Sequence, residues 1–88
     1  MPPRRPQLVR HARYRWDELR HQHQLVFPEG ILVLNDSGAA IVRHCDGRSM
    51  NELLAALNKE FAERPSEAEV QEFIERLLQK GLVRDADA

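Results

Sequence analysis

The chain contains a single cysteine, and that scarcity excludes two kinds of site. Cys45 has no partner cysteine among the 88 residues, so the chain cannot form an internal disulfide or a Cys-rich zinc site. The sequence also contains no apolar run long enough to span a bilayer. Its first residues, MPPRRPQ, lack the apolar core of a signal peptide and are typical of a flexible tail. These absences predict a protein without a membrane segment, in a reducing, cytoplasmic setting.

Catalytic motifs are equally scarce. With only four glycines, the sequence has no Gly-rich phosphate loop, and it has no nucleophile elbow. Ser37, Ser49 and Ser66 stand where helix caps belong, which favours capping over nucleophilic catalysis. Cys45 lies on the inner side of an expected helix, which is typical of a buried structural thiol. We therefore expect neither an enzyme nor a cofactor site.

The histidines do not predict a metal site. His21 and His23 share one face of an expected strand and could supply two ligands. A third ligand would have to be His11 or Asp17, and nothing in the sequence fixes either one. A solvated polar edge is the simpler interpretation, so we expect no bound metal.

Charge is nearly balanced overall but unevenly distributed. The chain has 13 Lys and Arg against 14 Asp and Glu, for a net charge of -1. Residues 1–24 contain six arginines, Arg4, Arg5, Arg10, Arg13, Arg15 and Arg20, and two acidic residues, Asp17 and Glu18. The first quarter is therefore basic and the remainder acidic, which bears on the choice of partner.

Three short stretches predict strands. Residues 12–17, ARYRWD, alternate charged and aromatic side chains with the period of a half-buried strand. Residues 23–27, HQLVF, and residues 31–35, ILVLN, are short apolar runs separated by a turn, PEG. Because the turn is short and apolar residues flank it, the second and third strands should form a hairpin.

Three helices are predicted to follow, over residues 35–47, 49–61 and 65–82. Asn35, Asp36 or Ser37 could cap the first helix, and Gly47 could close it. The second and third helices begin with Ser and Glu at the spacing of a capping box, Ser49 with Glu52 and Ser66 with Glu69. Gly81 should end the third helix, with Leu82 folding back on Leu77.

The order of elements predicts an α+β fold. Three short strands followed by three helices are segregated along the chain, so the helices can pack on one face of a small sheet. We expect a flexible tail over residues 1–7, one domain over residues 8–84, and a C-terminal tail over residues 85–88.

The third strand has no polar side. Ile31 and Val33 should point to one face of the sheet and Leu32 and Leu34 to the other. One interpretation is that the N-terminal segment, around residues 8–9, covers the second face. The other is that a partner does so: an extended peptide adding to the strand edge, or a second copy in a strand-paired or swapped homodimer.

Nucleic acid is the alternative partner. Three helices and a hairpin can form a winged helix-turn-helix, whose third helix enters the major groove. Acidic residues dominate the start of that helix, and its cations come later: Glu67, Glu69, Glu72 and Glu75, then Arg76 and Lys80. This pattern disfavours duplex binding, although the basic segment Arg10–Arg20 could contact RNA.

Taken in order, these motifs resemble the PqqD family, the small proteins of pyrroloquinoline quinone biosynthesis. The matching series PEG…LN…A…I…CDG comprises Pro28, Glu29, Gly30, Leu34, Asn35, Ala40, Ile41, Cys45, Asp46 and Gly47. The C-terminal pattern Val70–Leu82 also fits, and the resemblance covers about residues 6–84. Arg43 and His44 depart from it, because an aliphatic residue is expected there.

The resemblance implies a winged helix-turn-helix-like domain that acts as a peptide chaperone or adaptor. Members of the family bind the precursor peptide PqqA and present it to the radical-SAM enzyme PqqE, which cross-links a Glu and a Tyr of the peptide. In related recognition domains the peptide adds as a strand to the third strand, beside the third helix, and the resemblance implies the same here. The implied peptide-binding residues are Ile31, Leu32, Val33, Leu34, Asn35, Glu69, Val70, Phe73, Ile74 and Leu77.

Overall fold

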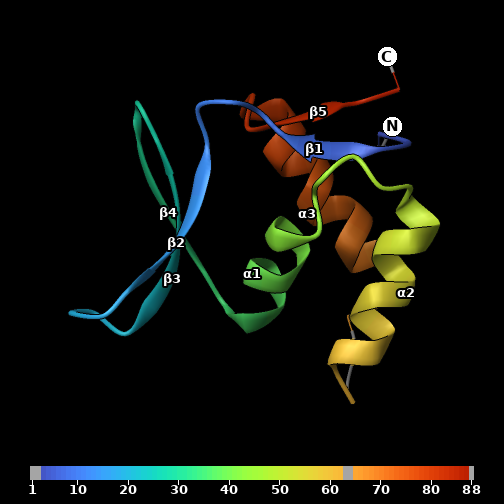
Figure 1. The fold of residues 1–88 in the computed structure, drawn as a ribbon, viewed down its shortest axis with the longest axis horizontal. Helices are drawn as coiled ribbons and strands as arrows, with labels where there is room; N and C mark the ends of the chain where they lie inside the picture. Colours follow the sequence, from blue (N-terminus) through green and yellow to red (C-terminus); the bar gives the residue numbers. More distant parts are fainter. Residues whose placement is uncertain (1–2, 63–64, 88) are drawn as a thin grey trace.

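In the computed structural model of the protein, residues 3–62 and 65–87 are described, and strands precede helices along most of the chain (Figure 1). Across these residues the elements are β1 (Pro6–Leu8), β2 (Arg13–Asp17), β3 (Gln22–Phe27), β4 (Gly30–Leu34), α1 (Asp36–Arg43), α2 (Met50–Glu60), α3 (Glu67–Gln79) and β5 (Val83–Asp85). The predicted α+β class is confirmed. The described residues form five strands rather than three, in two separate sheets.

The larger sheet has the order β2-β3-β4, and both of its pairings are antiparallel. The β3–β4 hairpin closes on the pair formed by Phe27 and Gly30, with Pro28 and Glu29 as its two-residue turn. The hairpin predicted from the PEG turn is therefore confirmed. β3 is the central strand, which leaves β2 and β4 at the two edges of this sheet.

The helix starts follow the predicted capping chemistry. Asn35 is the cap of α1, and its side-chain oxygen accepts a hydrogen bond of 2.7 Å from an amide in the first turn. Both predicted capping boxes are present, Ser49 with Glu52 at α2 and Ser66 with Glu69 at α3. Each box satisfies two amides that have no acceptor within the helix.

The helix ends agree with the prediction at α3 and differ from it at α1. Gly81, with a φ of 74°, follows α3, and the Leu82 amide donates to the Leu77 carbonyl at 2.9 Å, as predicted. α1 instead ends at Arg43, with His44 as its cap and Gly47 three residues further along the chain. The helix stops early because the following residues pair with β1.

The smaller sheet joins the two ends of the chain. β1 pairs with β5 in antiparallel register, from Pro6 opposite Asp85 to Leu8 opposite Val83. Residues 6–7 were expected to belong to a flexible N-terminal tail and Asp85 to a C-terminal tail, and the structure places all three in strands. Three-residue strands are too short to show an alternating pattern, and their pairing joins residues almost the whole chain apart.

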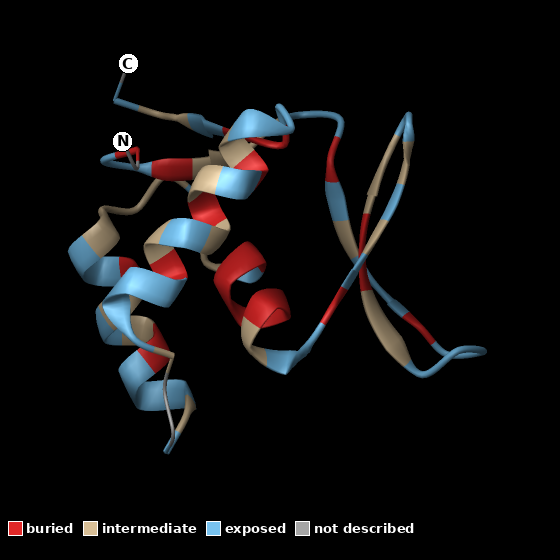
Figure 2. Ribbon diagram, turned by 180° about the vertical axis from the view of Figure 1, so that it is seen from behind, coloured by how far each residue is buried: buried red, intermediate tan, exposed pale blue. Residues whose placement is uncertain are grey.

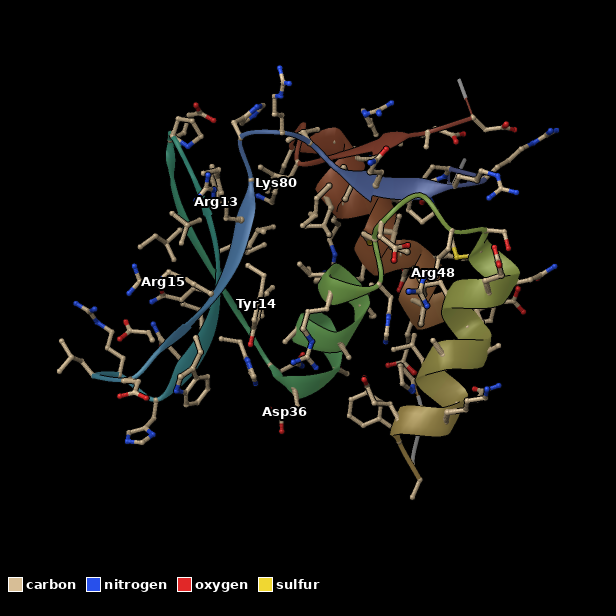
Figure 3. All side chains as sticks on the ribbon, in the orientation of Figure 1. Arg13, Tyr14, Arg15, Asp36, Arg48 and Lys80 are labelled. Atoms are coloured by element: carbon tan, nitrogen blue, oxygen red, sulfur yellow. The ribbon has the colours of Figure 1, made fainter. Side chains whose placement is uncertain are left out.

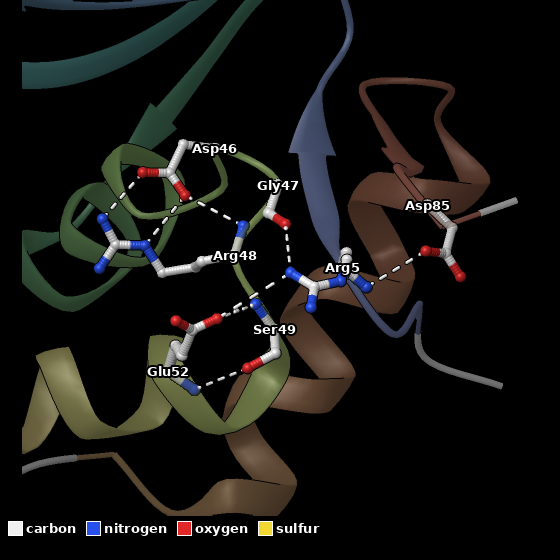
Figure 4. Close-up of polar contacts among 7 residues, drawn as sticks. All are labelled: Arg5, Asp46, Gly47, Arg48, Ser49, Glu52 and Asp85. Atoms are coloured by element: carbon white, nitrogen blue, oxygen red, sulfur yellow. Dashed lines mark hydrogen bonds and ion pairs between the residues drawn. The ribbon is translucent and has the colours of Figure 1, made fainter.

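The second border of β1 is also occupied, by the loop between α1 and α2. The Leu8 amide donates to the Cys45 carbonyl at 2.9 Å, and the Gly47 amide donates to the Pro6 carbonyl at 3.0 Å. Side chains strengthen this attachment, because the Arg5 guanidinium donates to the Gly47 carbonyl at 3.3 Å (Figure 4). β1 is therefore held on both sides.

Polar contacts also fix the loop itself. Arg48 donates to both carboxylate oxygens of Asp46, at 2.9 and 2.8 Å, and this bonding lowers the pKa of Asp46 to about 2 (Figure 4). On the opposite border of β1, Asp85 accepts hydrogen bonds from the backbone amides of Arg4 and Arg5, both at 3.1 Å. The N-terminal strand is thus anchored by main-chain and side-chain bonds together.

The core centres on α1, which lies between the larger sheet and the other two helices (Figures 1 and 2). Residues 38–42 of α1 are all buried, and the small side chains at its start allow the sheet to approach closely. Cys45 is 3% exposed and joins this core, as predicted for a structural thiol. Burial raises the pKa of Cys45 to about 12.

The buried thiol should be chemically silent in the folded protein. We expect Cys45 to react with iodoacetamide at pH 8 at least about 100-fold more slowly in the native chain than in urea. Only the thiolate attacks the reagent, and the raised pKa keeps Cys45 protonated in the folded protein. Mass spectrometry of timed samples would measure both rates. Comparable rates in the two conditions would show that Cys45 is accessible in the native state.

Removal of the α3 cap should weaken folding by a small, defined amount. We expect Ser66→Ala to lower the free energy of unfolding by about 1 kcal/mol, because the Glu69 amide loses its acceptor. Ser66→Asp keeps an acceptor and should lose much less. Urea unfolding followed by circular dichroism gives both values, and equal losses in the two variants would argue against capping.

Candidate functional site

One side of β4 carries backbone groups that no described segment of the chain pairs with. The hairpin closes on the pair of Phe27 and Gly30, and hydrogen-bonded and non-hydrogen-bonded pairs alternate from there. The pairs that contain Ile31 and Val33 are consequently the non-hydrogen-bonded ones. The N–H and C=O groups of these two residues point away from β3, and we call this side of β4 the open border.

The side chains of β4 differ sharply between its two faces. Leu34 is 6% exposed and belongs to the core, and Leu32 packs partly against that core. On the other face, Ile31 is 54% exposed and Val33 is 58% exposed. The strand therefore keeps its second apolar face in solvent, beside the open border.

The N-terminal segment does not cover this strand. β1 is paired with β5 on one side and with the α1–α2 loop on the other, and the Val9 amide donates to the Leu82 carbonyl at 3.0 Å. Leu8 and Val9 pack against the core but are not among the residues that line the space beside β4. Of the two interpretations, the one in which residues 8–9 cover the third strand is not supported by this arrangement.

A groove of about 610 Å³ lies beside the open border, between β4, the start of α1 and α3. The groove-lining residues are Leu32, Val33, Leu34, Asn35, Ser37, Gly38, Ile41, Pro65, Glu69, Glu72, Phe73, Arg76, Leu77 and Lys80. Its base is apolar and its α3 wall carries charge. This volume is within the range of ligand pockets in proteins, and the groove is open along the strand.

Close packing at Gly38 brings the groove walls together. A Cβ at this position would lie 3.0 Å from the Asn35 side-chain oxygen and 3.4 Å from the Phe73 ring. Gly38 is buried in the first turn of α1, so the lack of a side chain lets the strand end, the helix cap and α3 meet there.

The charged residues of the wall come from one side of α3. Glu69, Glu72, Arg76 and Lys80 follow the spacing of a single helical face and line the groove with Phe73. The Arg76 guanidinium lies 5.9 Å from the centre of the Phe73 ring. The arginines of β2, Arg13 and Arg15, do not line the groove. The charged side chains placed to meet a ligand in the groove are therefore those of α3.

Seven of the ten predicted binding residues line the groove: Leu32, Val33, Leu34, Asn35, Glu69, Phe73 and Leu77. Ile31 lies on the exposed face of the same strand, outside the lining. Val70 and Ile74 are both 0% exposed and belong to the core beneath α3. The structure thus places β4 and the side of α3 that carries Glu69 and Phe73 around one groove. Val70 and Ile74 lie on the other side of α3, in the core.

Sequence reasoning missed part of the lining. Ser37, Gly38, Ile41 and Pro65 lie in the groove without having been predicted there. Glu72, Arg76 and Lys80 could have been found, because they continue the helical face of Glu69 and Phe73. The residues of α1 gave no such signal, since their places depend on how the helix crosses the sheet.

Other polar clusters hold the fold together. His23 is hydrogen-bonded to Tyr14 at 2.7 Å and to Asp36 at 2.9 Å, which links β2, β3 and α1.

Within residues 3–62 and 65–87, no group of three or more His, Cys, Asp or Glu side chains is placed to hold a metal ion. In the same part of the chain, no helix is long and apolar enough to cross a membrane.

A family model and individual relatives point to the same protein family. Residues 22–83 match the family model described as "Coenzyme PQQ synthesis protein D (PqqD)". A "PqqA binding protein" of Azotobacter vinelandii is 44% identical over 72 residues, which cover 80% of this chain and 78% of that protein. The "PqqA binding protein" of Methylococcus capsulatus is 30% identical over 74 residues, covering 83% and 80% respectively.

A solved structure shares the fold. The solution NMR structure of the PqqD truncation of Methylobacterium extorquens PqqCD superimposes with a TM-score of 0.73 at 29% identity, over 90% of this chain and 87% of that one. That truncation is described as a functional, stand-alone recognition element for ribosomally synthesized and post-translationally modified peptides. Sequence motifs, family match and fold agree, and the chain belongs to the PqqD family.

Proposed function

We propose that this protein binds the precursor peptide PqqA by strand addition to β4 and presents it to the radical-SAM enzyme PqqE. It acts as an adaptor in pyrroloquinoline quinone biosynthesis and performs no catalysis itself. The observation that carries the proposal is the open border of β4, where the outward backbone groups of Ile31 and Val33 lie beside the apolar groove.

The geometry suits an extended peptide. An added strand would form main-chain hydrogen bonds with the open border, and these bonds supply affinity that depends little on side chains. Because strand side chains alternate, half of those on the peptide would enter the groove toward Phe73 and Leu77. The other half would lie beside Ile31 and Val33 on the exposed face. Groove contacts would thus set specificity, and the peptide side chains beside Ile31 and Val33 would shield one side of these two exposed residues.

The adaptor role follows from the size of the contact. β4 has five residues, so strand addition holds a short segment and leaves the rest of the peptide accessible to an enzyme. In this proposal the three helices and the β3–β4 hairpin serve as a winged helix-turn-helix-like frame for peptide recognition.

The alternative, nucleic-acid binding, has little support from the surface of α3. The exposed residues in its first turns include Glu67, Glu69 and Glu72, which would repel phosphate groups. Arg76 and Lys80 lie further along the helix, in the groove wall.

Removal of one outward donor should weaken PqqA binding. Val33→Pro removes an N–H that points to the open border, so the β3–β4 hydrogen bonds remain. A net hydrogen bond is worth about 1 kcal/mol, so we expect the Kd for synthetic PqqA to rise about fivefold or more. Isothermal titration calorimetry measures this Kd, with circular dichroism to confirm that the helices persist.

The other edge of the same sheet provides a matched control. Trp16, on β2, occupies a non-hydrogen-bonded pair with His23, so its N–H also points away from β3. Trp16→Pro should leave PqqA affinity unchanged. An unchanged affinity in a folded Val33→Pro protein, or an equal loss in both variants, would contradict strand addition at β4.

Salt should separate the two candidate partners. We expect the Kd for PqqA to change by less than about fivefold between about 50 and 200 mM NaCl, because main-chain and apolar contacts dominate. Proteins that hold duplex DNA through many phosphate contacts lose about 10³-fold or more over this range. Calorimetry with PqqA, and fluorescence anisotropy with a labelled duplex, provide the two measurements. Tight, steeply salt-dependent duplex binding without PqqA binding would favour the alternative.

A further inference from the structure

The charges in the groove wall are sorted by sign along α3. Glu69 and Glu72 line the part of the groove nearer the start of the helix, and Arg76 and Lys80 line the part nearer its end. All four side chains are exposed, so they can meet a ligand without rearranging the core. The wall thus has an acidic half and a basic half.

These charges are only partly engaged within the protein. Glu69 accepts a hydrogen bond from the Ser66 amide in the capping box. Glu72 and Lys80 form no ion pair with any other residue in the described ranges, 3–62 and 65–87. The Arg76 guanidinium lies 5.9 Å from the centre of the Phe73 ring and forms no ion pair with another residue in the same described ranges. Glu72 and Lys80 are therefore the two charged residues of the wall that are best placed to pair with charges on a ligand.

The sorted charges can be assigned to the two ends of β4. Lys80 lies at the same end of the molecule as Arg13, which is aligned across the sheet with Val26 and so with Ile31 (Figure 3). At the other end of β4, Leu34 and Phe73 both come close to Gly38. The basic half of the wall thus faces the beginning of β4, and the acidic half faces its end.

The two walls of the groove also match in length. From Glu69 to Lys80, α3 rises about 16 Å at ~1.5 Å per residue. Five residues of an extended strand span about the same distance at ~3.3 Å each. Because Phe73 lies near Leu34, a peptide that pairs with β4 and continues a few residues past Leu34 would pass both halves of the charged wall.

We infer that the groove recognises a strand of about five residues that is apolar on both faces, with a carboxylate side chain toward the Gly30 end of β4 and a cationic side chain toward the Asn35 end. This inference rests on the proposed function, since it names the chemistry of the peptide segment that the groove takes. Leu32, Leu34 and Phe73 favour apolar side chains on one face, and Ile31 and Val33 favour them on the other.

Two synthetic peptides of identical composition test the charge order. Acetylated and amidated KTVIVTE and ETVIVTK differ only in which end is acidic, so whatever the strand direction, one of them matches the wall and the other opposes it. Exposed ion pairs are worth about 0.2–1 kcal/mol each, so we expect a preference of about five- to tenfold for one peptide at low salt. NMR titration measures Kd values into the millimolar range.

A charge swap in the protein should reverse the preference. Glu72→Lys combined with Lys80→Glu leaves the net charge unchanged and inverts the wall, so the disfavoured peptide should become the favoured one. The control swap, Glu18→Lys with Lys59→Glu, changes residues outside the groove and should preserve the original order. The preference should shrink in about 0.5 M NaCl, because exposed charges are screened.

The outcomes separate this inference from the proposed function. The inference is overturned if the wild-type protein binds both peptides equally, if the swap leaves the preference unchanged, or if PqqA binds and neither short peptide does. Failure of PqqA itself to bind would overturn the proposed function. A reversed preference in the swapped protein, with the control unaffected, supports both.

Discussion

The unpaired backbone of Ile31 and Val33 is the constraint on which the rest of this structure depends. An exposed strand edge is a template for any extended chain, and proteins usually protect such edges. Here the protection is selective, because α3 runs alongside β4 and leaves a groove between them. A single extended strand fits beside β4, whereas a second sheet approaching the same border would meet the charged wall of the helix.

Keeping that border free requires the N-terminal segment to be held elsewhere. β1 is paired with β5 on one side and with the α1–α2 loop on the other, and Asp85 adds bonds to the amides of Arg4 and Arg5. A short chain has few elements with which to cover its own apolar surface. By using the ends of the chain to close the smaller sheet, the fold keeps β1 and β5 away from the open border of β4.

Capping and turn patterns in the sequence predicted those parts of the fold that depend on neighbouring residues. Both capping boxes, the PEG hairpin and the Gly81 helix end were predictable because each depends on residues within a few positions of one another. β1 and β5 were not, since each has three residues and pairs with a segment at the far end of the chain. The early end of α1 was missed because it also depends on a distant segment: Cys45 lies beyond the helix, and its carbonyl accepts a hydrogen bond from the Leu8 amide of β1.

The same distinction explains the candidate site. The apolar strand was recognisable from its sequence, since a strand with no polar side has an unusual pattern. The apolar positions of α3 were also recognisable, but the four predicted to bind, Val70, Phe73, Ile74 and Leu77, span a wide arc of the helix. The sequence does not reveal which edge of that arc faces a groove. Phe73 lies at the open edge, whereas Val70 and Ile74 lie fully in the core.

The contacts that fold the junction between β4 and α1 also form the floor of the groove. The Asn35 side chain accepts a hydrogen bond from the Gly38 amide, and that bond starts α1 directly after β4 ends. The bond also fixes the angle at which α1 leaves the strand, and Gly38 lets Phe73 approach the junction. Since one short junction sets the helix start, the end of the open border and the position of the Phe73 ring, the groove is formed by folding itself. A peptide would then enter a preorganised site, which reduces the ordering cost of binding.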